Sequence, residues 1–98
     1  MQTIAEITSK IRAVKPLLFR NGIERIGLFG SLMRGEGGKN SDLDVLLHFR
    51  NGYENFSNFN QACEVLEAVF PETKLDVVTA NGLSPYIGPH ILAEVVYV

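Results

Sequence analysis

The sequence predicts an α/β (α+β) fold in which helices flank a small mixed sheet of three strands. Apolar residues recur at helical spacing over 3–20 and 55–69, and short apolar runs at 24–29, 43–49 and 74–79 are typical of strands. The connections between these runs differ in length, which favours both antiparallel and parallel pairing. With 98 residues, 46% of them hydrophobic, the chain suits one small domain over 1–98.

The first helix has clear start and stop signals. Thr3 and Glu6 have the spacing of a capping box, and Asn-Gly at 21–22 supplies a left-handed end. Pro16 lies inside the pattern, so it either kinks one helix or opens a second. The apolar stripe expected to face the core consists of Ile4, Ile7, Ile11, Val14 and Leu18.

The later elements follow from similar signals. The first strand stops at Gly30, and residues 31–35 suit one helical turn with Ser31 as its N-cap. Pro71 ends the second long helix, and a short helix is expected after residue 83. The inner face of the second long helix is expected to consist of Phe56, Phe59, Cys63, Leu66 and Val69. His48, among apolar strand residues, is expected to be a partly buried structural histidine.

The lengths of the connections between the strands predict which residues lie close together in the fold. About a dozen residues join the first two strands, which favours antiparallel pairing, whereas a full helix joins the second and third, which suits a right-handed parallel crossover. The end of the first strand and the starts of the other two then share one edge of the sheet. Gly30-Ser31, Asp42, Asp44 and Asp76 are therefore expected to converge there.

A cluster of carboxylates beside a Gly-Ser turn suits the binding of a metal ion and phosphate groups. Neighbouring carboxylates raise one another's pKa unless a cation is present, and Mg²⁺ takes one or two carboxylates together with water and substrate phosphates. The turn at Gly30-Ser31 offers backbone N–H groups to a phosphate, and Arg34 is placed to neutralise a leaving pyrophosphate. The alternatives are that the acids only solvate a strand end, that Ser31 is only a cap, and that Arg34 is a surface residue.

The segment LFGSLMRGEGGKNSDLD, residues 28–44, resembles a family signature. Gly-Ser, ten residues, Asp-x-Asp and a later Asp76 are similar to the DNA polymerase β nucleotidyltransferase superfamily, and the short chain looks like its minimal nucleotidyltransferases (MNT). The resemblance implies the polymerase-β-type nucleotidyltransferase fold. It also implies that Asp42, Asp44 and Asp76 bind two Mg²⁺ ions and that Gly30 and Ser31 hold the phosphates of a nucleoside triphosphate.

The resemblance further implies a partner. Minimal proteins of this kind are commonly antitoxins that transfer AMP from ATP to a tyrosine of a HEPN-domain ribonuclease toxin, which suggests a hetero-oligomer. Two alternatives remain open: an antitoxin that acts only by binding and occlusion, and a transferase for a small-molecule acceptor. The base preference, the number of nucleotides added and the roles of His48, His90 and the C-terminal tail are also open.

Composition and charge indicate which partners and which cell compartment to expect. The net charge of −2 provides no basic field for nucleic acid, and the charged N-terminal segment fits neither a signal peptide nor a membrane span. One cysteine cannot form an internal disulfide, which fits a reducing cytoplasm. We therefore expect a cytoplasmic enzyme without direct contact to nucleic acid or membrane.

Overall fold

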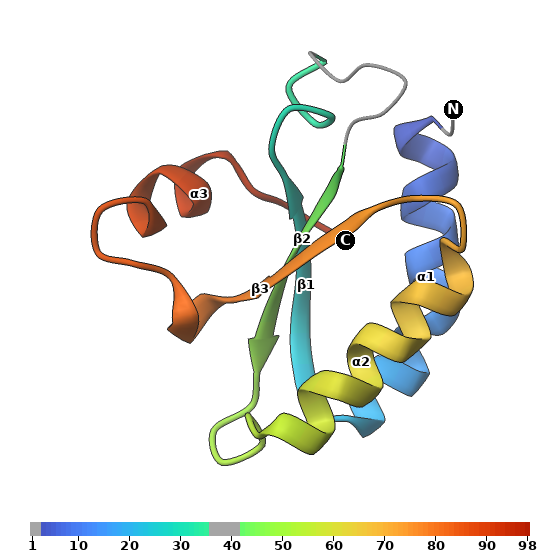
Figure 1. Ribbon diagram of the computed structural model, residues 1–98, viewed down its shortest axis with the longest axis vertical. Helices are drawn as coiled ribbons and strands as arrows, with labels where there is room; N and C mark the ends of the chain where they lie inside the picture. The colour runs from blue at the N-terminus through green and yellow to red at the C-terminus, as the bar shows by residue number, and fades with distance from the viewer. Residues whose placement is uncertain (1–2, 36–41) are drawn as a thin grey trace.

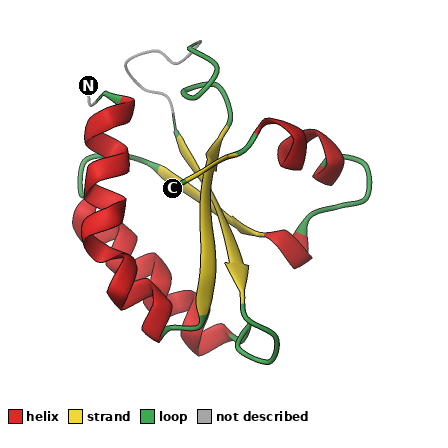
Figure 2. Cartoon of the chain, turned by 180° about the vertical axis from the view of Figure 1, so that it is seen from behind, coloured by secondary structure: helices red, strands yellow, loops and turns green. Residues whose placement is uncertain are grey.

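The computed structural model describes residues 3–35 and 42–98 and contains one four-stranded mixed sheet with helices on both faces (Figures 1 and 2). Its elements in chain order are α1 (Ile4–Arg20), β1 (Ile23–Phe29), β2 (Leu43–Phe49), α2 (Phe56–Val69), β3 (Leu75–Thr79), the 3₁₀ turn η1 (Ala80–Gly82), α3 (Gly88–Glu94) and β4 (Val96–Tyr97). No helix in these described ranges is long and apolar enough to span a membrane.

The sheet has the strand order β3-β2-β1-β4. β1 and β2 pair antiparallel and β2 and β3 pair parallel, so both predicted pairings are confirmed. The predicted fold class is also correct, except that the sheet has four strands rather than three. In Figure 1, α1 and α2 lie side by side against one face of the sheet, while α3 lies on the other side.

α1 is one continuous helix, which resolves the question raised by Pro16. The capping box between Thr3 and Glu6 forms as predicted. The helix ends at Arg20 with Asn21 as its C-cap, after which Gly22 takes a left-handed conformation with φ +86°. Pro16 is on the exposed side, where water can satisfy the carbonyl that the proline leaves without a helical partner. Ile4 was wrongly predicted to face the core, since it is 43% exposed at the first helical position.

α2 begins one residue later than predicted, because Asn55 is its N-cap and accepts a hydrogen bond from the Asn58 N–H at 2.8 Å. Its buried residues are Ala62 and Leu66. Phe56 was wrongly predicted to be core, since it is the first residue of α2 and is 77% exposed.

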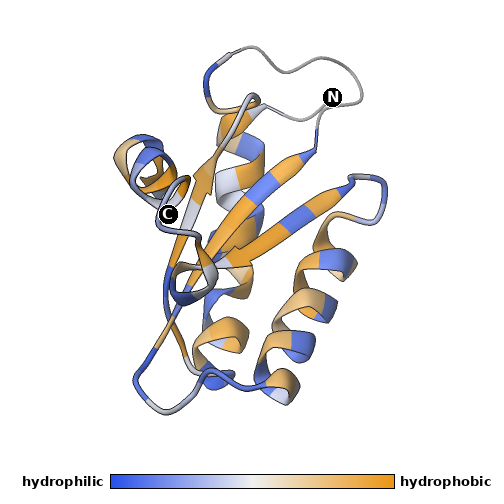
Figure 3. Cartoon of the chain, turned by 60° about the vertical axis from the view of Figure 1, so that its left-hand side comes forward, coloured by the Kyte–Doolittle hydropathy of each residue, from blue (hydrophilic) through white to orange (hydrophobic). Residues whose placement is uncertain are grey.

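Two hydrophobic clusters lie on opposite faces of the sheet. Alternate residues of β2 divide between them, with Val45 and Leu47 under the long helices and Leu46 on the α3 face. The larger cluster packs against α1 and α2, and the smaller one contains Phe29, Leu46 and Ile91. Figure 3 shows hydrophobic and hydrophilic residues alternating along the strands. The polar residues of the α3 face are therefore free to form a site.

β4 is the strand that the sequence did not reveal. It pairs antiparallel with β1, and the Val98 N–H donates to the Ile26 carbonyl at 2.9 Å. The Tyr97 hydroxyl lies 2.8 Å from His48 Nε2, and the Arg25 guanidinium lies 3.6 Å from the centre of the Tyr97 ring. Burial, and then the charge of Arg25, lower the pKa of His48. The expected structural role of His48 is therefore supported by its contacts.

Candidate active site

The strand register brings two of the three candidate aspartates side by side. Asp44 of β2 is the partner of Asp76 of the parallel strand β3, and on its other side it is the partner of Phe29, the last residue of β1. Alternation along β2 places Asp44 on the α3 face of the sheet, opposite the side chains under α1 and α2. The predicted convergence of the two strands at this edge is thus present in the fold.

Gly30 makes close contact with Asp44. Its backbone has φ +85°, and a Cβ atom at this position would overlap the Asp44 carboxyl group. A side chain here would therefore meet both backbone strain and a clash. Glycine lets the chain leave β1 directly beside the carboxylate, so the turn and the acid form one small surface.

The turn that follows is anchored to the fold. The Arg34 N–H donates to the Gly30 carbonyl at 3.1 Å, which closes a single turn. Gly30, and not Ser31 as predicted, therefore accepts the first bond of the turn, while Ser31 is half-buried within it. Leu32 and Met33 pack against the larger core cluster. The turn is consequently held in place by packing against the larger core cluster.

The electrostatics of Asp44 reflect this crowding. Its pKa is raised to about 6, first by burial, then by repulsion from Asp76 and a hydrogen bond between the two carboxyl groups, and then by Asp42. The positive charge of Arg34 acts in the opposite direction. A carboxyl group that titrates near neutral pH beside a second acid is a common feature of catalytic sites.

Asp42 lies just before β2, and its carboxylate is 4.0 Å from the Lys74 ammonium group. The Leu43 N–H donates to the Lys74 carbonyl at 2.9 Å, so the pairing of β2 with β3 continues to this point. Lys74 was not among the predicted site residues. The parallel register would have identified it, because Lys74 precedes Leu75 exactly as Asp42 precedes Leu43.

Arg34 makes an ion pair that sequence reasoning also missed. Its Nη1 atom donates to both carboxylate oxygens of Glu94, at 3.0 and 3.2 Å. Glu94 is the last residue of α3, 60 positions further along the chain. No local pattern points to such a contact, since it depends on how α3 packs on the sheet.

The acidic residues suit Mg²⁺, although they do not already form a cage. In residues 3–35 and 42–98, no three His, Cys, Asp or Glu side chains are grouped closely enough to hold a metal ion by themselves. Mg²⁺ needs only one or two carboxylates, because water and substrate phosphates fill its other positions. Repulsion from Asp76 helps to raise the pKa of Asp44, and a bound cation would relieve that repulsion.

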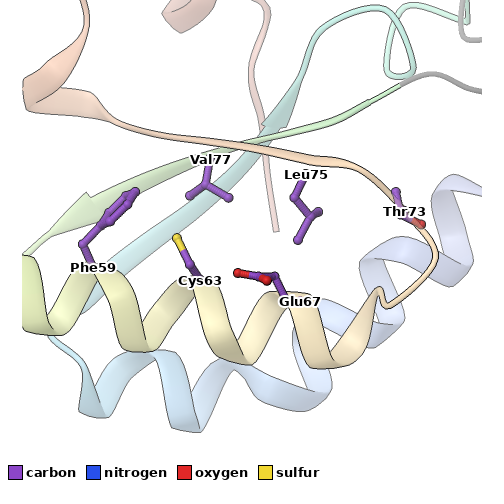
Figure 4. A pocket seen from close by; sticks show the side chains of 6 residues that line it. All are labelled: Phe59, Cys63, Glu67, Thr73, Leu75 and Val77. Carbon is purple, nitrogen blue, oxygen red and sulfur yellow. The ribbon is translucent and has the colours of Figure 1, made fainter.

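A separate cavity of about 340 Å³ lies between α2 and β3. Figure 4 shows the side chains that line it, which are Phe59, Cys63, Glu67, Thr73, Leu75 and Val77. Leu75 and Val77 alternate with Asp76, so the cavity opens on the opposite face of β3 from the aspartates. Burial, and then the charge of Glu67, raise the pKa of the Cys63 thiol. This cavity is distinct from the aspartate cluster.

Comparison with known proteins identifies relatives that are described as nucleotidyltransferases or protein adenylyltransferases. A family model described as the nucleotidyltransferase domain matches residues 10–98. Protein adenylyltransferase MntA of Thermococcus cleftensis is 38% identical over 99 residues, covering 100% of this chain and 98% of that protein. A Methanocaldococcus jannaschii protein, provisionally named a protein adenylyltransferase, is 34% identical over 101 residues and covers 100% of both chains.

Solved structures show the same fold. One described provisionally as a minimal nucleotidyltransferase has a TM-score of 0.82 at 29% identity and covers 97% of this chain and 95% of its own. A toxin–antitoxin structure with AMP-PNP has a TM-score of 0.66 at 22% identity, covering 91% and 69%. A complex of tri-AMPylated Shewanella oneidensis HEPN toxin with MNT antitoxin has a TM-score of 0.61 at 17% identity, covering 92% and 69%. At these identities, the last two show the fold alone.

Proposed function

Because this chain belongs to the nucleotidyltransferase domain family, we propose that it transfers AMP from ATP to a tyrosine hydroxyl of a cognate HEPN-domain toxin and thereby neutralises it. The observation that carries the proposal is the pairing of Asp44 with Asp76 directly beside Gly30. The names of the relatives support the protein acceptor, since one is a protein adenylyltransferase and a structural neighbour contains an AMPylated HEPN toxin.

In this proposal the Gly30–Arg34 turn holds the nucleotide. Gly30 and Ser31 present backbone and hydroxyl groups to the phosphates, and the absence of a side chain on Gly30 lets a phosphate come close. Arg34 neutralises charge on the pyrophosphate as it leaves. Much of the rate enhancement then comes from fixing the α-phosphate in place before reaction.

In the same proposal the aspartates hold the metal and activate the acceptor hydroxyl. Asp42, Asp44 and Asp76 would hold Mg²⁺, which supplies charge stabilisation for the phosphates when it is bound. The tyrosine oxygen attacks the α-phosphorus, the bond to the pyrophosphate oxygen breaks, and Asp76 accepts the phenolic proton. Asp76 is exposed, so an acceptor from another chain can reach it.

The partner and the setting follow from the same proposal. The toxin supplies the tyrosine hydroxyl and the surface that covers the sheet edge. The toxin and the domain of residues 1–98 together form a hetero-oligomer. ATP is the donor, and no nucleic acid or membrane is needed for the reaction. Cys63 is a free thiol, which is compatible with a cytoplasmic reaction.

Intact-mass analysis of the co-expressed toxin tests the proposal. The toxin is taken from the reading frame next to the gene for this chain and purified with wild-type protein, Asp44→Asn or Asp76→Asn. We expect the toxin to gain one or more AMP units with wild-type protein and none with either variant, because each substitution removes a carboxylate from the paired acids.

The control is Glu64→Gln, which removes an exposed carboxylate from α2, where Glu64 accepts a bond from Asn60. It should modify the toxin as wild type does. An unmodified toxin that is nevertheless neutralised would contradict the proposal and favour occlusion. A modified toxin with the Asp44→Asn/Asp76→Asn double variant would show that the acids are not the catalytic groups.

A further inference from the structure

Glu94 connects α3 to the proposed phosphate-binding turn. Both of its carboxylate oxygens accept hydrogen bonds from Arg34 Nη1, at 3.0 and 3.2 Å. The two side chains are 47% and 35% exposed, and ion pairs at such exposure contribute little to folding stability. The contact therefore restricts the direction of the Arg34 side chain more than it stabilises the fold.

The backbone on the Glu94 side of this pair is fixed by packing. Ile91, one turn before Glu94, is buried against Phe29 and Leu46 in the smaller core cluster. Val95, the next residue, packs so closely over Gly27 that a Cβ atom there would overlap it. Glu94 is thus held between two anchored residues.

The Arg34 side is also anchored. Leu32 and Met33 pack against the larger core cluster, and the Arg34 N–H is bonded to the Gly30 carbonyl. The charge of Arg34 is close enough to the aspartates to influence Asp44. The Arg34 guanidinium therefore contacts the carboxylate of α3 while its charge also acts on the acidic edge of the sheet. A long, flexible side chain is held near the site by a partner from a distant element.

We propose that Glu94 is a positioning residue that orients the Arg34 guanidinium toward the triphosphate of ATP. The inference rests on the proposed function. An arginine that is ordered before the nucleotide arrives loses less side-chain freedom on binding, and each contact then contributes more to affinity. Glu94 itself touches no reacting atom and acts through Arg34.

Direct nucleotide binding tests this role separately from catalysis. Fluorescence titrations measure the dissociation constants of ATP and AMP, with Mg²⁺ present, for wild type, Glu94→Gln, Glu94→Asp, Arg34→Ala and the Arg34→Ala/Glu94→Gln double variant. We expect Glu94→Gln to weaken ATP binding about three- to tenfold, less than the loss of a whole charge-assisted contact because Arg34 remains, and to leave AMP binding unchanged. Glu94→Asp should recover part of the loss.

The double variant provides the decisive comparison. If Glu94 acts through Arg34, adding Glu94→Gln to Arg34→Ala changes ATP affinity no further. Equal losses in both backgrounds, equal losses for ATP and AMP, or tighter ATP binding by Glu94→Gln would overturn the inference. Glu64→Gln serves as the control, and the melting temperature of each variant identifies any loss through unfolding. Failure of the wild-type protein to bind ATP would instead overturn the proposed function.

Discussion

Asp44 lies half-buried between Gly30 and Asp76, and its charge opposes folding at neutral pH. Its pKa rises from 3.8 to about 6 in the folded chain, mainly through burial. Between these two values the folded state binds more protons than the unfolded state, so the wild-type free energy of unfolding falls as pH rises. Above about pH 6 the full cost of the charge is present.

Asp44→Asn is therefore expected to stabilise the protein at alkaline pH. At pH 8 the free energy of unfolding should rise by about 1 kcal/mol, a figure reduced for solvent screening of a half-buried group. The gain should shrink toward pH 4, where the wild-type carboxyl is protonated in the folded state. Urea unfolding at both pH values, without Mg²⁺, measures the difference.

Glu64→Gln, on the exposed surface of α2, is the matched control and should change stability little at either pH. A destabilised Asp44→Asn protein at pH 8 would contradict the electrostatic account. The result also matters for function. A charged residue that lowers the free energy of unfolding is not needed for folding, which favours a functional role for it.

Some of the site residues could be brought together from the sequence alone. Connection lengths alone placed Gly30, Asp44 and Asp76 at one sheet edge, because antiparallel and parallel pairing leave few topologies. Glu94 did not follow, since its contact with Arg34 depends on the packing of α3. Whether these residues catalyse transfer is a prediction that the experiments above address.

Among the elements, α3 has the weakest local signals. It contains seven residues, and its N-cap makes no side-chain hydrogen bond. So short a helix is marginal by itself, and tertiary packing must stabilise it. Ile91, which is 8% exposed, contacts Phe29 and Leu46 and supplies that packing. The position of Glu94 consequently depends on this apolar packing, together with that of Val95 over Gly27.

Ile91→Ala should lower the free energy of unfolding by about 2 kcal/mol, the lower end of the range for removing a large aliphatic side chain from a core. It should also weaken ATP binding, because Glu94 loses its anchor. Urea unfolding and the ATP titration measure the two effects.

Leu92→Ala, at a neighbouring position that is 48% exposed, is the control and should change stability by less than about 0.5 kcal/mol. Equal effects of the two substitutions would show that Ile91 does not anchor α3.

Elements with long patterns were predictable, and short or terminal ones were not. α1 and α2 have several turns of apolar periodicity, and their faces were largely correct except at Ile4 and Phe56, which are the first residues of the two helices and are exposed. β4 contains only Val96 and Tyr97, and it forms by pairing with a strand some 70 positions earlier. Two residues carry no periodicity, so no sequence pattern could reveal this strand.

For the whole molecule, ligand binding should appear as added stability. The proposed binding of ATP with Mg²⁺ to the folded chain, and not to the unfolded one, should raise the melting temperature increasingly with concentration. Asp44→Asn should lose most of the Mg²⁺-dependent part of this shift, because it removes one of the paired carboxylates. Thermal unfolding with ATP in Mg²⁺ or in EDTA separates the two contributions, and equal shifts in both would contradict a role for the metal.

The parallel register of β2 and β3 limits how this molecule can vary. A one-residue slip would turn Asp76 to the helix face and place an apolar side chain beside Asp44, because strand residues alternate between faces. Insertions and deletions between α2 and β3 must therefore be absorbed within residues 70–74, before the ladder begins. Relatives that keep this chemistry should differ in the length of that turn while the spacing within β2 and β3 stays constant.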